Sequence, residues 1–276
     1  MQAEGITHAF LVPTMLARIV ALLRERGGVE LPTLRSLSYG GARMPVPVLE
    51  AALELFPNAG FVNAYGLTET SATVTVLGPD DHRAAFGSDD PVVRARLGSV
   101  GRPVPGVEIE VVGGDGVAAP PGAEGTIRIR GDQVSGQYVG QGSAVDGDGW
   151  LVTGDLGTFD DEGYLYVHGR SDDVIIVGGE NISPGEVEDC LLRHPAVSAV
   201  AVVGVPDEEW GEQVGAMVTV AVDATVDGDQ LAGWVRDHLG GLKAPKRVAL
   251  ADELPMTPTG KVLRRVVRAE LAQGPS

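Results

Sequence analysis

Two short segments of this chain combine small residues with polar side chains that suit a nucleotide and its phosphates. In the first, Tyr65 and Gly66 precede Thr68 and Glu69. A hydroxyl beside a carboxylate can bind one phosphate oxygen and one hard cation, and glycine lets a flat base approach the backbone. The same residues also fit a helix that starts with a Thr cap and an acidic first turn, so both interpretations stay open here.

The second segment is the loop Tyr39-Gly40-Gly41-Ala42, in which missing or minimal side chains again leave room for a base. Further along, Asp155 follows Gly154 at the end of an apolar segment. A carboxylate at a strand end can accept hydrogen bonds from both hydroxyls of a ribose, although an Asp after Gly is also a common turn former.

A third segment, residues 169–188, predicts a strand, a tight turn and a helix in succession. A charged turn containing Asp172 leads into an apolar, β-branched run and then a Gly pair. Ser183 and Glu186 have the spacing of a capping box, with Pro184 at the first helical position. Taken alone, the acidic turn could equally be an ordinary solvated turn before a strand.

Composition excludes several classes of protein. The 276 residues carry a net charge of −17, which would repel nucleic acid. No apolar run approaches the roughly eighteen residues of a membrane span, so we expect a cytoplasmic protein without one. The single cysteine, Cys190, excludes an internal disulfide and makes a Cys-rich metal site implausible.

Local positive charge for a nucleotide would come from the C-terminal segment. The basic residues of this segment are Lys243, Lys246, Arg247, Lys261, Arg264, Arg265 and Arg268. Most of them should form an ordinary solvated face.

Hydrophobic periodicity predicts an α/β fold in several subdomains. Helices over about 13–26 and after Pro45 alternate with strands at 34–39 and 60–64, which favours part of a doubly wound parallel sheet with ligands at the carboxyl ends of its strands. Short strands at 107–112, 126–130, 150–153 and 164–167 predict a small antiparallel β-barrel or sandwich. After residue 170 we expect a compact α+β unit with helices to about 193 and from 229 to 240, and strands at 197–205, 216–222 and 248. The predicted domains are therefore residues 1–95, 96–170 and 171–276.

Three motifs resemble those of the adenylate-forming enzymes, the superfamily of acyl-CoA synthetases, peptide-synthetase adenylation domains and luciferases. Gly-Arg-x-Asp-Asp at 169–173, followed by Gly-Gly-Glu-Asn-Ile-x-Pro-x-Glu-Val-Glu at 178–188, resembles the interdomain hinge of that family. Tyr-Gly-x-Thr-Glu at 65–69 is similar to its nucleotide motif. The end of the chain, with Gly260-Lys261, resembles its lysine loop. A P-loop is excluded there, because Pro255 and Val262 stand where Gly and Ser or Thr are needed.

The resemblance implies a role for each matching residue. It implies that Tyr65 stacks on adenine, that Thr68 binds a phosphate and that Glu69 helps to hold Mg²⁺. Asp155 and Arg170 would flank the ribose. The remaining implied positions are the base-binding loop Gly40, Gly41, Ala42 and Gly66, the catalytic Lys261, the hinge Asp172, and Gly178 and Gly179 beside the pantetheine arm of CoA.

The implied reaction has two steps. A carboxylate attacks the α-phosphorus of ATP to give acyl-AMP and pyrophosphate, and the thiol of CoA then displaces AMP to give a thioester. Fixed cations would stabilise the charge of the first step. The C-terminal domain would then rotate at Asp172 to replace Lys261 with a thiol tunnel. Apolar pocket residues such as Val12, Pro13 and Met15 favour a fatty or aromatic acid.

Two departures from the family pattern limit these expectations. Related ligases place an aromatic residue and an Arg near the CoA nucleotide, whereas this chain has Leu-Lys-Ala-Pro at residues 242–245. Trp210 could supply an aromatic surface there, or it could pack in the interior. The family's phosphate loop ending in Pro-Lys-Gly does not occur in this sequence. We therefore expect the C-terminal part of a longer synthetase, which alone binds AMP weakly at best and does not adenylate.

Two other functions stay open. The chain could belong to a peptide-synthetase adenylation domain, although its hinge carries Gly-Glu-Asn-Ile, which those domains usually lack. It could also be a non-catalytic relative that keeps a nucleotide pocket. The sequence does not define an oligomeric state.

Overall fold

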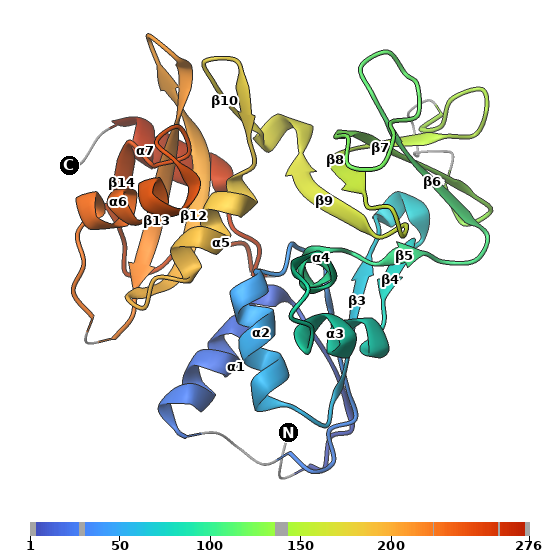
Figure 1. The fold of residues 1–276 in the computed structure, drawn as a ribbon, viewed down its shortest axis with the longest axis horizontal. Coiled ribbons are helices and arrows are strands. Elements are labelled where there is room, and N and C mark those ends of the chain that lie inside the picture. Colours follow the sequence, from blue (N-terminus) through green and yellow to red (C-terminus); the bar gives the residue numbers. More distant parts are fainter. Residues whose placement is uncertain (1–3, 28–30, 136–142, 223, 259, 274–276) are drawn as a thin grey trace. The chain divides into compact units, whose positions relative to one another are not determined.

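A computed structural model describes residues 4–27, 31–135, 143–222, 224–258 and 260–273 of the chain (Figure 1). The residues fall into two compact units, Met1–Ser171 and Asp172–Ser276. The fold is α/β throughout, as the sequence predicted; the division into three domains stays a prediction.

The first sheet of the first unit is built from β-α-β repeats. Its strands lie in the order β1-β2-β3-β4-β5, parallel from β1 to β3 and antiparallel from β3 to β5. Their bounds are β1 (His8–Leu11), β2 (Ser36–Gly40), β3 (Gly60–Tyr65), β4 (Thr75–Leu77) and β5 (Arg102–Pro103). The helices are α1 (Pro13–Glu25), α2 (Val46–Leu55), α3 (Pro79–Phe86) and α4 (Pro91–Ala95). The carboxyl ends of β2 and β3 are neighbours, so the two loops singled out in the sequence leave the same edge.

One apolar core holds this sheet to its helices. Fully buried side chains from α1, α2, β2 and β3 pack together, among them Leu16, Leu37, Leu49 and Phe61. The helical ones recur at the three- and four-residue spacing of one helix face, which explains why these segments are helices.

A buried polar pair lies within this core. The Tyr39 hydroxyl is 2.8 Å from Nε2 of His82, whose Nδ1 is 2.7 Å from the Gly78 carbonyl oxygen. His82 is fully buried, and this burial lowers its pKa to about 4. Nδ1 therefore donates to Gly78, and unprotonated Nε2 accepts from Tyr39.

The second sheet of the first unit is antiparallel and open. Its order is β6 (Val107–Val112), β7 (Gly125–Gly131), β8 (Leu151–Phe159) and β9 (Leu165–Arg170). Within the described residues no ladder joins β6 to β9, so the expected small β-barrel is corrected to an open sheet.

The sheet can stay open because its apolar face is covered from elsewhere in the unit. On that face Val111, Ile127 and Ile129 pack against Tyr65, which ends β3, and Val74, which directly precedes β4 of the first sheet. Further side chains form a charged layer in which Arg128 and Arg130 pair with Glu110 and Glu108 and lie over the ring of Trp150. A sheet buried in this way has no need to close on itself for its apolar side chains.

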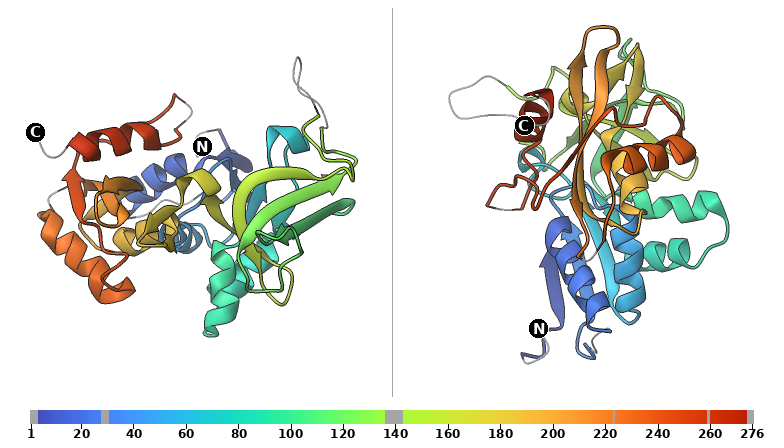
Figure 2. Two further views of the ribbon diagram at one scale, coloured as in Figure 1. Left: turned by 90° about the horizontal axis from the view of Figure 1, so that it is seen from above. Right: turned by 90° about the vertical axis from the view of Figure 1, so that its left-hand side faces the viewer.

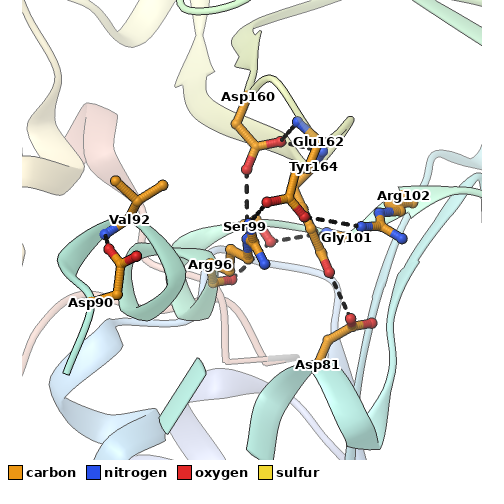
Figure 3. Close-up of polar contacts among 10 residues, drawn as sticks. All are labelled: Asp81, Asp90, Val92, Arg96, Ser99, Gly101, Arg102, Asp160, Glu162 and Tyr164. Carbon is orange, nitrogen blue, oxygen red and sulfur yellow. Dashed lines mark hydrogen bonds and ion pairs between the residues drawn. The ribbon is translucent and has the colours of Figure 1, made fainter. Parts of the chain in front are cut away.

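A polar joint fixes the two sheets of this unit against each other (Figure 3). The Tyr164 hydroxyl donates to Asp81 at the start of α3, 2.7 Å away. Arg96 pairs with Glu162 at 2.5 Å and lies near Asp160. The guanidinium carbons of Arg96 and Arg102 lie 4.6 and 4.2 Å from the centre of the Tyr164 ring. The joint anchors the turn between β8 and β9, the two strands that carry Asp155 and Arg170.

The second unit is a five-stranded sheet with helices on both faces. Its order is β11-β10-β13-β12, with β14 parallel to β13. The bounds are β10 (Ile175–Val177), β11 (Glu180–Ile182), α5 (Pro184–Leu192), β12 (Val197–Asp207), β13 (Gly211–Val220), α6 (Gly228–Leu239), β14 (Arg247–Leu250) and α7 (Arg264–Gln273).

Alternating side chains of β12 serve two cores. Val202 packs with α5 and α6, whereas its neighbour Val203 packs with Val267 and Leu271 of α7. Successive strand residues point to opposite faces, so an uninterrupted apolar run is buried on both sides. Figure 2 shows α6 and α7 on opposite sides of these strands. Helix α7 was not predicted from the sequence.

The expected capping box at the start of α5 is wrong. Ser183 is the N-cap residue but makes no side-chain capping hydrogen bond. The Glu186 carboxylate is instead bound by Nζ of Lys243, which lies 2.7 Å from both of its oxygens. Glu186 therefore pairs with Lys243, which is distant in the sequence.

None of the helices in the described part of the chain combines the length and the apolarity that a membrane crossing needs.

The buried His82 predicts a specific pH dependence of stability. Its pKa in the folded protein, about 4, lies below the ordinary value of 6.5, so the unfolded chain binds the proton first. The free energy of unfolding should therefore fall as the pH drops below 6.5, by roughly 3 kcal/mol once the pH is below 4. His82→Gln should remove this part of the loss, as followed by urea denaturation between pH 7 and pH 4. His8→Gln, at an exposed position of the same unit, is the control; equal pH profiles for wild type and His82→Gln would refute the assignment.

Candidate functional site

Three residues predicted from the sequence meet at one place in the first unit. Tyr65 ends β3, Asp155 lies within β8, and Arg170 ends β9. The Tyr65 hydroxyl donates to Oδ2 of Asp155 at 2.6 Å, and Nη1 of Arg170 lies 3.6 Å from Oδ1. Asp155 and Arg170 are also direct partners across the β8–β9 ladder. The structure thus brings together a phenol, a carboxylate and a guanidinium from three strands.

Burial sets the protonation of this group. The Asp155 residue is only 6% exposed, and this burial raises the pKa of its carboxyl, while the hydrogen bond from Tyr65 and the charge of Arg170 act in the opposite direction. Burial raises the pKa of Tyr65 far above its ordinary value as well, with a further contribution from Asp155. The phenol therefore remains a hydrogen-bond donor at neutral pH.

Thr153 supports Asp155 and was not singled out in the sequence analysis. Its hydroxyl accepts the Asp155 backbone N–H at 3.0 Å and donates to the Ile127 carbonyl at 2.9 Å. Between the two, Gly154 has a φ of +73°, and a Cβ there would lie 3.1 Å from Nη2 of Arg170. The available signal was the i, i+2 spacing of Thr153 and Asp155, which places both on one face of a strand.

The loop with Thr68 and Glu69 joins β3 to β4 and is a tight turn. Thr68–Thr70 form a single turn of 3₁₀ helix with Leu67 as its N-cap residue, so the Thr68 hydroxyl is not the cap. Thr68 is exposed and Glu69 is half-buried, whereas Thr70 is fully buried. The Thr70 hydroxyl instead accepts the Leu67 N–H at 2.9 Å. The interpretation as a Thr-capped helix therefore does not hold for this loop.

The glycine loop leaves β2 beside this turn. Gly40 is paired with Ala64 of β3, and a Cβ on Gly40 would lie only 2.7 Å from the Ala64 carbonyl oxygen. Gly41 has a φ of +80°, which favours glycine. Gly41 and Ala42 are both exposed. The loop thus keeps backbone accessible at the carboxyl edge of the sheet.

In the second unit, Trp210 lies against the predicted Gly pair. The Gly178 N–H donates to the Trp210 carbonyl at 3.0 Å, and a Cβ on Gly178 would be 2.6 Å from Cε3 of the indole. Gly178 and Gly179 both have positive φ, +58° and +91°. The Trp210 side chain remains 48% exposed, so it offers an aromatic surface and is not a residue of the interior.

The lysine loop and the predicted hinge belong to the second unit as well. Lys261 is exposed, and its loop is closed by hydrogen bonds in both directions with Thr257, at 2.8 and 3.0 Å. Arg264 follows at the start of α7 and pairs with the buried Glu188 at 2.8 Å. Arg264 also lies 4.0 Å from Asp173, next to Asp172 in a 3₁₀ turn. The second unit therefore contains Lys261, Asp172 and the Gly pair, whereas the first contains Tyr65, Thr68, Glu69, Asp155 and Arg170.

The donor set at Glu69 fits a magnesium ion that is shared with a nucleotide. Mg²⁺ is usually bound through one or two carboxylates together with substrate phosphates and water, and Glu69 lies next to an exposed hydroxyl. Among the described residues no three His, Cys, Asp or Glu side chains are grouped so as to hold a metal by themselves.

The glycine loop and Tyr65, at the carboxyl ends of the parallel strands β2 and β3, are typical of a nucleotide-binding α/β protein, and comparison with known proteins identifies the family. The profile described as AMP-binding enzyme matches residues 1–139, and that of the AMP-binding enzyme C-terminal domain matches residues 186–261. The chain belongs to this family of AMP-binding enzymes.

Similar proteins include several ligases. Feruloyl-CoA synthase from an Amycolatopsis species is 41% identical over 271 residues, which cover 97% of this chain and 52% of that protein. A 2-succinylbenzoate–CoA ligase from Bacillus mycoides is 36% identical, with 97% of this chain and 53% of that protein covered. The chain spans about half the length of the curated relatives it matches.

Solved structures give the same result. The amide bond synthetase McbA from Marinactinospora thermotolerans aligns with a TM-score of 0.83 at 38% identity, covering 98% of this chain and 54% of that one. The o-succinylbenzoate CoA synthetase from Bacillus subtilis, solved with its acyl-adenylate intermediate, aligns with a TM-score of 0.78 at 34% identity, over 96% of this chain and 51% of that one.

The electrostatics of the site can be tested without a ligand. Tyr65→Phe removes a hydrogen bond that lowers the pKa of Asp155, so that pKa should rise further in the variant. Arg170→Met should raise it by less. Carbon-detected NMR titration of the Asp155 carboxyl measures both values. An unchanged pKa in Tyr65→Phe would show that the phenol does not act on this carboxyl.

Proposed function

We propose that this chain provides the nucleotide site and the lysine-bearing domain of an AMP-forming ligase that converts a carboxylic acid to acyl-AMP and then to its CoA thioester. The observation that carries the proposal is the meeting of Tyr65, Asp155 and Arg170. The three residues lie on three strands, and together they offer an aromatic ring for adenine, a carboxylate for the ribose hydroxyls and a cation beside the ribose.

In this proposal Asp155 accepts hydrogen bonds from the ribose. Its Oδ2 already accepts from Tyr65 and its Oδ1 faces Arg170, so the carboxylate is fixed before the nucleotide arrives. A carboxylate oxygen has more than one lone pair, which leaves acceptor capacity for the two hydroxyls. The same bond orients the Tyr65 ring for stacking on adenine, and the exposed Arg170 closes the other side of the ribose.

The adenylation step requires positive charge where two anions meet. Thr68 would bind a phosphate oxygen, and Glu69 would hold Mg²⁺, which offsets phosphate charge when bound. Lys261 would supply a fixed ammonium to the α-phosphate and the attacking carboxylate. Such preorganised charge is worth several kcal/mol in a dry site.

Transfer to CoA would use the other residues of the second unit. Rotation at Asp172 would withdraw Lys261 and bring Gly178 and Gly179 beside the pantetheine arm, where missing side chains leave room. The exposed Trp210 ring could stack on a flat group. Lys243, in the segment that departs from the family pattern, is paired with Glu186 and is a weaker candidate for a CoA phosphate.

The substrate class we favour is an aromatic acid. Several relatives are named for the aromatic acids feruloyl, 2-succinylbenzoate and anthranilate, whereas one is named for a fatty acid. In this chain Phe10 and Met15 are exposed large apolar residues, and the Phe10 ring lies 3.8 Å from the position of a Cβ on Gly40. An apolar surface beside the glycine loop suits an aromatic or aliphatic acyl group.

Nucleotide binding tests the proposal on the chain itself. Asp155→Asn keeps the shape of the side chain but removes its charge, so affinity for AMP should fall about tenfold, the equivalent of roughly 1.4 kcal/mol for a charged hydrogen bond. Isothermal titration with AMP measures the loss. Asp148→Asn, an exposed position of the same unit, is the matched control. Equal affinities for both variants would remove the ribose role from Asp155.

The role of Lys261 requires a protein in which this chain is joined to the half that its relatives also contain. Lys261→Ala should slow acyl-AMP formation about 100-fold or more, by analogy with the loss of one charge-stabilising group. Thioester formation from supplied acyl-AMP should change little. Lys246→Ala, an exposed lysine of the same unit, is the control. Equal losses in both half-reactions would contradict a role limited to the first step.

A further inference from the structure

The loop that carries Thr68 and Glu69 is strained. Ser71 and Ala72 have φ angles of +52° and +90°, in a region that residues other than glycine rarely adopt. The loop also returns so closely on itself that a Cβ on Gly66 would lie 1.4 Å from the Ala72 carbonyl oxygen. Strain of this kind persists only where surrounding contacts hold it.

Those contacts come from Gln133, which follows β7 and is distant in sequence. Its Nε2 donates to the carbonyl oxygens of Thr70 at 2.8 Å and of Thr73 at 2.7 Å. The Gln133 carbonyl in turn accepts the Ser71 hydroxyl at 2.9 Å. The side-chain amide therefore binds the loop on both sides of the two strained residues, and both of its N–H groups are used.

A second contact from the same segment reaches the functional residue itself. The backbone N–H of Ser135 donates to the Glu69 carbonyl oxygen at 2.5 Å. Residues 133 and 135 thus contact the loop at four points, counting the Ser71 hydroxyl, the carbonyls of Thr70 and Thr73, and that of Glu69.

We propose that Gln133 is a positioning residue, which holds the strained loop so that Thr68 and Glu69 face the phosphates of the nucleotide. The inference rests on the proposed function for the roles of Thr68 and Glu69. Gln133 acts through the loop backbone, while Tyr65, Asp155 and Arg170 hold the nucleoside by contacts that do not involve it.

The chemistry of the clamp requires an amide. Methionine has nearly the same length and volume but donates no hydrogen bond, so it would leave the carbonyls of Thr70 and Thr73 unpaired. Glutamate has nearly the same shape, but its ionised carboxylate would face those two carbonyl oxygens with no proton to donate. If Gln133 acts through its two donors, glutamate should be the worse substitute. If only the shape matters, glutamate should be the better one.

The test compares Gln133→Met and Gln133→Glu with wild type, and uses Asp132→Asn at the exposed neighbouring position as control. Affinities for ATP with Mg²⁺ and for adenosine are measured by isothermal titration. We expect affinity for ATP with Mg²⁺ to fall about tenfold in Gln133→Met and further in Gln133→Glu, with adenosine affinity unchanged. Equal losses for both ligands, or a smaller loss in Gln133→Glu than in Gln133→Met, would overturn the proposal.

Hydrogen exchange provides a measurement that does not depend on ligand binding. The Ala72 N–H donates to the Leu67 carbonyl within the loop, and its exchange should accelerate at least tenfold in both Gln133 variants, with no change for amides of β7. Unchanged exchange at Ala72 would overturn the proposal. If wild type binds neither adenosine nor ATP, nucleotide binding by this chain alone fails instead, and hydrogen exchange decides whether Gln133 holds the loop.

Discussion

The first unit depends on the burial of one carboxylate at the place where its two sheets meet. A buried carboxylate costs several kcal/mol unless it is hydrogen-bonded and paired. Asp155 receives a hydrogen bond from Tyr65 of the first sheet, backbone support from Thr153, and the charge of Arg170 on the neighbouring strand. These partners coincide only when both sheets are correctly placed, and the joint around Tyr164 and Arg96 fixes that placement.

Much of this site could be predicted because its residues lie in contiguous motifs. Tyr65, Thr68 and Glu69 lie within five consecutive positions, and the parallel arrangement of β2 and β3 follows from helices that alternate with apolar strands. Asp155 and Arg170 were predicted to flank the same ribose, but their direct pairing across β8 and β9 could be learned only from the structure. Their chemical roles, and the hinge role of Asp172, stay predictions.

The features that were not predicted from the sequence depend on contacts between side chains that are far apart along the chain. The capping box failed because Lys243 reaches Glu186, and a local pattern carries no information about such a competitor. Gln133 carried no signal either, since an amide after a strand is common, and its importance comes from the strained loop it binds. The expected barrel stayed open because the first sheet covers its apolar face.

The end of strand β9 places the residue proposed to contact the ribose close to the residue proposed as the hinge. Arg170 is its last residue, and the 3₁₀ turn of Ser171–Asp173 begins at the next position. A single residue, Ser171, therefore lies between Arg170, whose guanidinium is beside Asp155, and Asp172. If Arg170 contacts the ribose and Asp172 is the hinge, as proposed, then a torsional change at this turn would move the backbone directly next to a ligand-binding side chain. A substitution of Ser171 would therefore affect both the position of Arg170 and the turn that contains Asp172.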